Sequence, residues 1–424
     1  MRATIVASWA LFLGIAMIML GNGLQGSLLG LRATVEGFST ATTGFVMSAY
    51  YVGFLLGSSL APKLVKRVGH IRVFTALASM ASAAVLLHAV FTTPAAWTAM
   101  RIVTGFSYAG LYVVAESWLN DRATNETRGQ LLSVYMVIML GGMGGGQLLL
   151  NVADPAGFEL FILVSVLVSA ALVPIALTAF AAPDFSAPSH VGLKRLYEIS
   201  PLGVFGAFGT GMAHGAAFGM GAVYARNVGL SVGEISYFMA ALFLGGVLLQ
   251  WPIGHLSDRV DRRRIITIVT FVAAIVAFAA IPVSGQSTLA LLVLMCLFGG
   301  MSLPLYSLCL AYTNDHLEPS QMVAASATLV FVVGAGAIFG PTLAAVLMSV
   351  IGSNGFFWWL GSIHAGIGVF AIYRMTKSDA TPVEEQTHYV PVPSRASPVA
   401  AYLTHSMVGD EMDRDLARLG RSRR

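Results

Sequence analysis

An arginine and two tyrosines recur along one apolar stretch at spacings that place them on one face of a helix. Arg101, Gly105, Tyr108 and Tyr112 lie at i, i+4, i+7 and i+11, and Glu116 falls near the edge of the same stripe. An arginine near the centre of a membrane helix costs about 2.5–3.5 kcal/mol to insert. We therefore predict a track that faces a cavity and handles a charged solute or protons. The alternative is that Arg101 reaches the outer headgroups while the tyrosines only pack.

Glu116 allows two interpretations. It is expected to lie near the inner end of its helix, close to the basic residues Lys66, Arg67, Arg72 and Arg128. Because charges inside a membrane usually pair, we predict a gating or structural ion pair. Proton carriage by the carboxylate is the alternative.

Neutral polar side chains occur in two other apolar stretches. Asn22 and Gln25 are one helical turn apart, and so are Gln147 and Asn151. Both pairs are expected at a depth similar to that of Arg101, which indicates a polar cup open to the outside. Each pair by itself would also fit interhelical hydrogen bonds worth about 0.6–2 kcal/mol.

The second half of the chain adds a histidine and a tyrosine. His214 lies near the centre of an apolar stretch, and histidine titrates in the physiological range, so a role in proton coupling is one interpretation. A hydrogen-bonded core histidine is the other. Tyr306 matches a position near Tyr112 in the first half and is expected to line the opposite wall.

Several kinds of chemistry have no support in the sequence. It holds no phosphate-binding glycine loop with lysine, no histidine and cysteine cluster at metal-ligand spacing and no nucleophile elbow. Cys296 and Cys309 both lie in apolar stretches and are expected to be small buried hydrophobes. We expect neither an enzyme nor a cofactor.

The elements that position these residues follow from composition. Of 424 residues, 56% are hydrophobic and 10% are charged, which indicates a polytopic membrane protein. Segments of about 20 apolar residues, each able to cross about 30 Å of hydrocarbon, recur throughout, and each must be a helix because lipid cannot satisfy an open backbone. We predict an all-α protein of twelve transmembrane helices. The predicted organisation is a six-helix bundle over 1–182, a linker over 183–200, a second bundle over 201–377 and a disordered tail over 378–424.

A highly charged loop occurs twice. Residues 254–264 read GHLSDRVDRRR, and Lys66–Arg67–Val68 lies 192 residues before Asp258–Arg259–Val260, with Lys66 at the acidic position. A second pair of segments, GLYVVAESWLND from Gly110 and PLYSLCLAYTND from Pro304, is offset by 194 residues. The duplicated loop resembles the signature of the major facilitator superfamily of membrane transporters.

That resemblance implies two pseudo-symmetric six-helix bundles that rock around a midplane cavity. It further implies a cytoplasmic gate in which Asp258 holds arginines of adjoining helices. The residues assigned to the gate are Asp258, Arg259, Arg262, Arg263, Lys66, Arg67, Arg72 and Arg128. The substitution of Lys66 for the acid puts the first-half lock in doubt.

The segment AESWLND…TRGQLLSVYM, within Ala115 to Met136, is similar to the uncharacterised bacterial YcaD-like branch of this superfamily. The expected function is proton-coupled transport of a small solute, with efflux favoured over uptake or facilitated diffusion. A solute that is anionic or rich in hydroxyls would suit Arg101 and its polar neighbours, whereas a hydrophobic drug would suit the aromatic residues. A membrane sensor or scaffold that does not transport and signals through its tail is the third hypothesis.

Basic residues set the expected orientation. Lysines and arginines gather in the loops on one side of the predicted spans, while the other side receives only Arg32 and Arg226. We expect a multi-pass inner-membrane protein, monomeric, with both termini cytoplasmic and no nucleic-acid partner. The terminal arginines, residues 421–424, are candidates for contact with anionic lipid.

Overall fold

The computed structural model describes residues 8–124, 127–177 and 191–400, and within these residues it contains helices and loops but no β-strand. The helices of the first half are α2 (Trp9–Val35), α3 (Thr40–Val68), α4 (His70–Val90), α5 (Pro94–Arg122), α6 (Arg128–Leu148), the short 3-10 turn η1 (Leu149–Asn151), α7 (Glu159–Ala170) and α8 (Leu172–Ala176).

The second half repeats this plan after a short helix, α9 (Leu193–Ile199), that lies within the predicted linker. Its helices are α10 (Pro201–Asn227), α11 (Val232–Ser257), α12 (Arg262–Val283), α13 (Thr288–Ser302), α14 (Leu305–Asn314), α15 (Pro319–Ile351) and α16 (Gly355–Met375), followed by the 3-10 turn η2 (Val383–Glu385).

Twelve helical segments account for the predicted spans. Ten of them are long and apolar enough to cross a membrane, with α7 and α8 counted as one segment and α13 and α14 as another. The other two, α5 and α10, are 29 and 27 residues long and are largely buried by neighbouring helices. Because protein rather than lipid surrounds them, they tolerate more polar and small residues. The prediction of an all-helical membrane protein is confirmed.

Glycines allow very close helix contacts at equivalent places in the two halves. A Cβ at Gly53 or Gly105 would overlap a backbone carbonyl of the facing helix where α3 crosses α5, and Gly245 and Gly299 stand in the same relation where α11 crosses α13. The two pairs are offset by 192 and 194 residues, as in the duplicated loops. Small residues let helix backbones approach this closely. The internal repeat read from the sequence is therefore also a repeat of packing.

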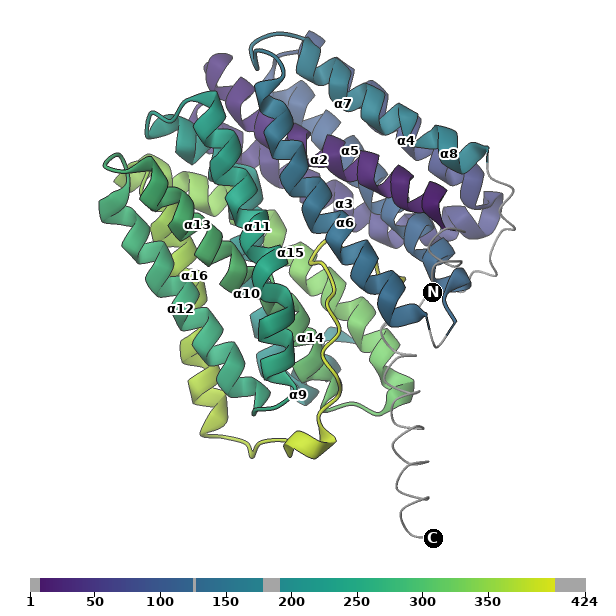
Figure 1. Ribbon diagram of the computed structural model, residues 1–424, viewed down its shortest axis with the longest axis vertical. Coiled ribbons are helices and arrows are strands. Elements are labelled where there is room, and N and C mark those ends of the chain that lie inside the picture. The colour runs from purple at the N-terminus through teal and green to yellow at the C-terminus, as the bar shows by residue number, and fades with distance from the viewer. Residues whose placement is uncertain (1–7, 125–126, 178–190, 401–424) are drawn as a thin grey trace.

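The two halves meet at one end of the molecule and are separated at the other. We call the end where α11 gives way to α12 the tail end, and the opposite end the distal end. Near the distal end, Gly44 of α3 abuts Pro341 and Ala345 of α15, and the hydroxyls of Ser48 and Thr342 lie 2.8 Å apart. In Figure 1 the helices of the first half are inclined to those of the second, and the yellow chain after α16 runs between them.

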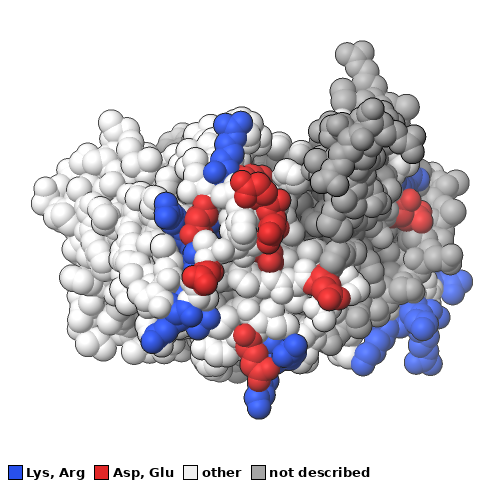
Figure 2. Space-filling model, turned by 90° about the horizontal axis from the view of Figure 1, so that it is seen from below, with Lys and Arg blue, Asp and Glu red and all other residues white. Residues whose placement is uncertain are grey.

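Charged side chains gather at the tail end. Figure 2, seen from below, shows lysine, arginine, aspartate and glutamate grouped on this face. The helix ends explain the grouping, because α3 ends with Lys66 and Arg67, α12 begins at Arg262 and α16 ends with Arg374 in its last turn.

Candidate functional site

Arg101 is buried between helices. Its guanidinium carbon lies 4.5 Å from the centre of the Tyr50 ring, a distance suited to a cation–π contact, and 5% of its surface is exposed. Its Nε has no hydrogen-bond partner, and within the described part of the chain no carboxylate lies at ion-pair distance. The structure thus places Arg101 among protein side chains and not at the surface, where it would have to lie to reach headgroups.

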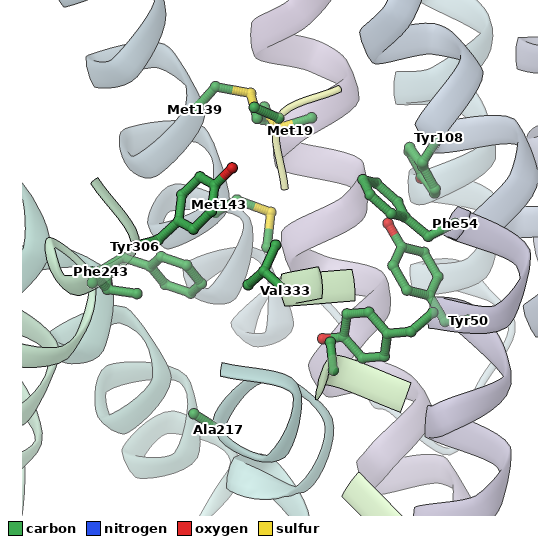
Figure 3. Close-up of a cluster of buried hydrophobic side chains, with 14 of the residues drawn as sticks. Met19, Tyr50, Phe54, Tyr108, Met139, Met143, Ala217, Phe243, Tyr306 and Val333 are labelled. Carbon is green, nitrogen blue, oxygen red and sulfur yellow. The ribbon is translucent and has the colours of Figure 1, made fainter. Parts of the chain in front are cut away.

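Of the predicted stripe on α5, Arg101 lines a cavity between the halves, whereas Tyr108 and Tyr112 are buried against Tyr50 and Phe54 of α3. The rings of Tyr108 and Tyr112 have centroids 6.4 Å apart, and the amide nitrogen of Asn22 donates to the Tyr112 hydroxyl at 2.7 Å. Figure 3 shows Tyr50, Phe54 and Tyr108 on one side of this region, facing Phe243 and Tyr306 on the other. Tyr50 and its neighbour Tyr51 were not among the predicted site residues, although a tyrosine pair inside an apolar span is itself a signal.

The predicted polar cup is only partly assembled. Asn22 and Gln147 line the same small cavity as Arg101, with a volume of about 20 Å³, which is room for about one water molecule. Gln147 also joins two helices, since it accepts from Ser27 at 2.5 Å and donates to the carbonyl of Gly23 at 2.9 Å. These two bonds are the interhelical hydrogen bonds that the sequence offered as the alternative role for this residue.

The other two amides of the cup lie elsewhere. Gln25 is buried outside the lining of that cavity, and both polar atoms of its amide lack a hydrogen-bond partner among the described residues. Asn151 donates to Ser236 of α11 at 2.7 Å, which ties the two halves together near the distal end.

His214 and Tyr306 occupy the opposite wall. His214 has its Nε2 3.1 Å from the carbonyl of Ser302 and its Nδ1 2.9 Å from the hydroxyl of Ser394. With Nε2–H donating to the carbonyl, Nδ1 is left to accept from the serine, as in a neutral ring. Tyr306 is buried, and its hydroxyl has no hydrogen-bond partner among the described residues.

Glu116 is bound differently from the predicted ion pair. It is fully buried and accepts from the Tyr135 hydroxyl at 2.6 Å and from the backbone N–H of Ser397 at 3.0 Å, and it also accepts from the Ser397 hydroxyl. Lys66, Arg67 and Arg72 are exposed and form no ion pair within the described residues. The side chain of Arg128 lies outside the described part. The basic side chains of this loop are exposed, whereas Glu116 is buried, so the predicted ion pair does not form.

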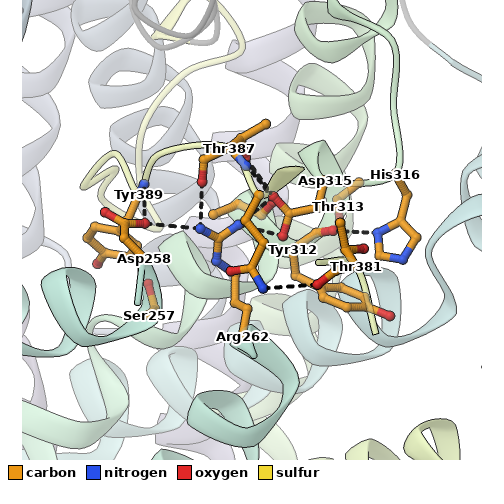
Figure 4. A network of polar contacts seen from close by, with 12 residues as sticks. Ser257, Asp258, Arg262, Tyr312, Thr313, Asp315, His316, Thr381, Thr387 and Tyr389 are labelled. Atoms are coloured by element: carbon orange, nitrogen blue, oxygen red, sulfur yellow. Dashed lines mark hydrogen bonds and ion pairs between the residues drawn. The ribbon is translucent and has the colours of Figure 1, made fainter. Parts of the chain in front are cut away.

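The second-half signature loop forms a compact network at the tail end (Figure 4). Arg262 binds both oxygens of Asp315, at 2.6 and 2.5 Å, and donates to Asp258 at 3.1 Å. Arg263 pairs with Asp261 at 3.0 Å, whereas Arg259 is exposed. Asp258, Arg262 and Asp315 all belong to the second half, so the network braces one bundle, and no ion pair among the described residues joins the loops of the two halves.

The chain after α16 is the main departure from the sequence prediction. A disordered tail was expected from Ser378, but residues 387–400, here called the C-terminal segment, enter the space between the halves; residues 401–424 lie outside the described part. Within the segment Val390, Val392, Ala396, Ser397, Val399 and Ala400 are buried. The segment is apolar enough to be buried, and side chains of the helices satisfy several of its backbone groups.

Tyr389 marks the beginning of this buried path. Its hydroxyl accepts from the Gln250 amide at 2.7 Å, and burial raises the pKa of that hydroxyl well above its usual range. A groove of about 460 Å³ between α6 and α11 remains open beside Tyr389 and Pro391.

Known proteins resemble this chain in both sequence and fold. The sequence model of the Major Facilitator Superfamily matches residues 11–200 and 203–408. The uncharacterised MFS-type transporter YcaD of Escherichia fergusonii is 27% identical over 372 residues, which is 87% of this chain and 96% of the relative. A mutant of the nucleoside transporter NupG superposes with a TM-score of 0.73 at 12% identity, over 86% of this chain and 98% of that one. A bacterial homologue of the human lysosomal transporter Spinster, in an inward-facing and unoccupied conformation, gives a TM-score of 0.69 at 13% identity, over 96% and 98% of the two chains.

Proposed function

The chain belongs to the major facilitator superfamily, and from this membership we propose that it moves a small solute across the membrane by alternating access. It is an integral multi-pass membrane protein, and its two halves are the bodies that would rock against each other. The space between them, which Arg101 of α5 and the tyrosines Tyr50 and Tyr51 of α3 line from one side, is the proposed solute path. One chain contains both walls, so we propose that a monomer is sufficient.

The buried guanidinium of Arg101 is the observation that carries this proposal. A cation without a carboxylate partner inside a membrane protein is costly and marks a functional site. Around it Tyr50, Tyr51 and Asn22 offer hydroxyl and amide groups to a solute. An anionic solute would supply the missing counter-charge.

We propose that the tail end faces the cytoplasm and that the protein lies in the inner membrane. The described basic residues at helix ends concentrate at the tail end, while Arg32 and Arg226 close helices at the distal end. Positive residues favour the cytoplasmic side.

We propose proton coupling with export of the solute, and Glu116 as the proton-binding group. It is a buried carboxylate that forms no ion pair within the described residues, and a hydroxyl donor, Tyr135, lies beside it. His214 is the second candidate, and its ring nitrogens, like the carboxylate oxygens of Glu116, are hydrogen-bonded.

Uptake of a hydroxyl-rich metabolite is the second candidate. The neutral hydrogen-bonding groups of Asn22, Tyr51 and Tyr112 favour it, since they suit sugar-like solutes as well as they suit anions.

Everted membrane vesicles energised to a proton gradient and monitored with a pH-sensitive dye test the proposal. One member of a panel of drugs, sugars and organic acids should dissipate the gradient with the unaltered protein, and Arg101→Ala should reduce that response about tenfold or more, which corresponds to about 1.4 kcal/mol of lost interaction. Arg226→Ala, which removes an exposed arginine at the distal end, should leave the response unchanged.

Two outcomes would contradict parts of this proposal. An equal response from Arg101→Ala and the unaltered protein would remove Arg101 from the solute path. Silence across the panel, together with accumulation of a labelled solute by whole cells, would replace export with uptake.

A further inference from the structure

We propose that the space between the halves is a binding site for an extended peptide, that the C-terminal segment of the same chain occupies it, and that transport requires this segment to leave. The inference rests on the proposed function, because it takes the filled space to be the solute path. The segment would act as a tethered plug, inserted from the tail end.

The plug is anchored first on the charged network of the second half. Thr387 donates to Asp315 from both its backbone N–H and its hydroxyl at 2.8 Å, and its carbonyl accepts from Arg262 at 2.6 Å. The backbone N–H of Tyr389 donates to Asp258 at 2.8 Å. The signature loop therefore holds main-chain atoms of the plug as well as its own bundle.

The next contacts recognise the peptide backbone. The hydroxyl of Ser307 accepts from the N–H of Val392 and donates to its carbonyl, each at 2.9 Å. Both main-chain groups of one residue are thus satisfied by a single side chain of α14. Prolines at 391 and 393 lack an N–H and favour an extended backbone, so this stretch needs few other partners.

The tip of the plug is a turn at Arg395, closed by a hydrogen bond of 2.9 Å from the N–H of Ala396 to the carbonyl of Pro393. The Arg395 guanidinium carbon lies 4.5 Å from the ring centre of Phe218 and within 5.7 and 6.0 Å of those of Tyr50 and Tyr51. An aromatic cage of this kind binds cations. Arg395 and Arg101 thus share the Tyr50 ring and line the same small cavity, so the tip lies in the proposed solute path and sets a second positive charge beside the one that an anionic solute would neutralise.

After the turn the chain runs along the first half. Ser397 binds Glu116 through its backbone N–H and its hydroxyl, and Val399 and Ala400 are buried. The plug therefore contacts the second half through Asp258 and Ser307 and the first half through Glu116. Because alternating access changes the position of one half relative to the other, a segment bound to both holds them in one arrangement.

Little room for a solute remains around the tip. The cavities beside it measure about 20, 40 and 10 Å³, whereas pockets for small molecules are typically about 300–1,000 Å³. The plug and a solute therefore compete for the space around the tip, whereas the groove of about 460 Å³ beside Tyr389 and Pro391 stays open.

Accessibility of the plug is the first test, and it does not depend on transport. In the full-length chain, Ala396→Cys should react slowly with a membrane-impermeant maleimide added to everted vesicles, whereas Ala380→Cys, in an exposed part of the same tail, should react fast. Vesicles carrying the unaltered chain give the background from Cys296 and Cys309. Addition of Ser397→Glu, which sets a second carboxylate against Glu116, should speed the labelling of the Ala396→Cys variant about tenfold or more. Equal labelling of Ala396→Cys and Ala380→Cys would overturn the plug.

Transport by full-length Ser397→Glu is the second test. Its initial rate should exceed that of the unaltered protein about tenfold, whereas Ala380→Glu, which adds the same charge outside the plug, should leave the rate unchanged. A synthetic peptide of residues 387–400 added to the vesicles should return the Ser397→Glu rate to the low value, and a peptide with Arg395→Ala and Ser397→Ala should not.

The two tests separate failure of the plug from failure of the proposed function. If Ser397→Glu speeds labelling of the thiol at position 396 but leaves the transport rate unchanged, the plug is overturned as a regulator while transport stands. The expected labelling in a protein that moves no solute in vesicles or whole cells would overturn the proposed function and leave a peptide-binding membrane protein, as the sensor hypothesis requires.

Discussion

Replacement of Arg262 by methionine should lower the free energy of unfolding by about 3–5 kcal/mol, the usual cost of breaking a buried ion pair by removing one partner. Arg262 and Asp315 are 1% and 2% exposed, and the shorter of their contacts measures 2.5 Å. Methionine keeps the length of the side chain but leaves Asp315 buried without a cation. Unfolding of the purified protein in mixed detergent micelles measures the loss.

Two further variants isolate the ion pair. Arg259→Met makes the same change at an exposed arginine of the same loop. Its free energy of unfolding should stay within about 0.5 kcal/mol of that of the unaltered protein. Arg262→Met combined with Asp315→Leu should recover most of the loss, because no uncompensated charge remains. Equal stability of the two single variants would show that the network contributes nothing to folding.

Arg262→Met should also loosen the plug. The arginine donates to the carbonyl of Thr387 at 2.6 Å, so its loss removes an anchor where the segment enters the space between the halves. When it is combined with Ala396→Cys, faster maleimide labelling of the introduced thiol is the expected result, whereas Arg259→Met should not change the labelling rate.

Alanine at Gly105 should destabilise the protein by about 3 kcal/mol, at the upper end of the cost of overpacking. The added Cβ would overlap the carbonyl of Tyr50, which belongs to the backbone and cannot rotate away. Helices α3 and α5 would have to separate, and the position of Arg101 relative to the Tyr50 ring would change with them. Chemical unfolding in detergent should therefore show a loss of stability together with a loss of transport.

Gly141→Ala is the matched control. A Cβ at Gly141 meets nothing within 4 Å, and alanine in place of a helical glycine stabilises by about 0.5–1 kcal/mol. The two substitutions should thus change the free energy of unfolding in opposite directions. Because Gly299 holds the equivalent position in the second half, Gly299→Ala should lower the stability about as much as Gly105→Ala does. A Gly105→Ala protein as stable as the unaltered one would contradict the close crossing of α3 and α5.

The twelve spans and the internal repeat could be read from the sequence because both depend on local composition. Apolar length specifies a membrane helix wherever it occurs, and equal offsets specify a duplicated unit. The common face of Arg101, Tyr108 and Tyr112 was predictable for a related reason, since helical periodicity fixes which residues of one helix share a side.

Partners on other helices could not be read in this way. Tyr50 stacks on Arg101 because α3 crosses α5 at Gly53 and Gly105, and Gln147 turns to Ser27 because of the rotation of α6 against α2. Glu116 was predicted to meet basic loop residues that lie closer along the chain. In the structure it binds Ser397, which is 281 residues away.

The C-terminal segment shows most clearly what sequence and tertiary structure each decide. The sequence by itself determined an all-helical membrane protein of two similar halves, with a cationic, aromatic stripe on one helix, because those properties follow from residue composition and helical spacing. Only the tertiary structure decided what lies opposite that stripe. The stretch from Tyr389 to Ala400 is too short to bury a core of its own, and its three prolines prevent regular helix or strand pairing. It becomes ordered only where Asp258, Ser307 and Glu116 from separate helices converge to satisfy its backbone.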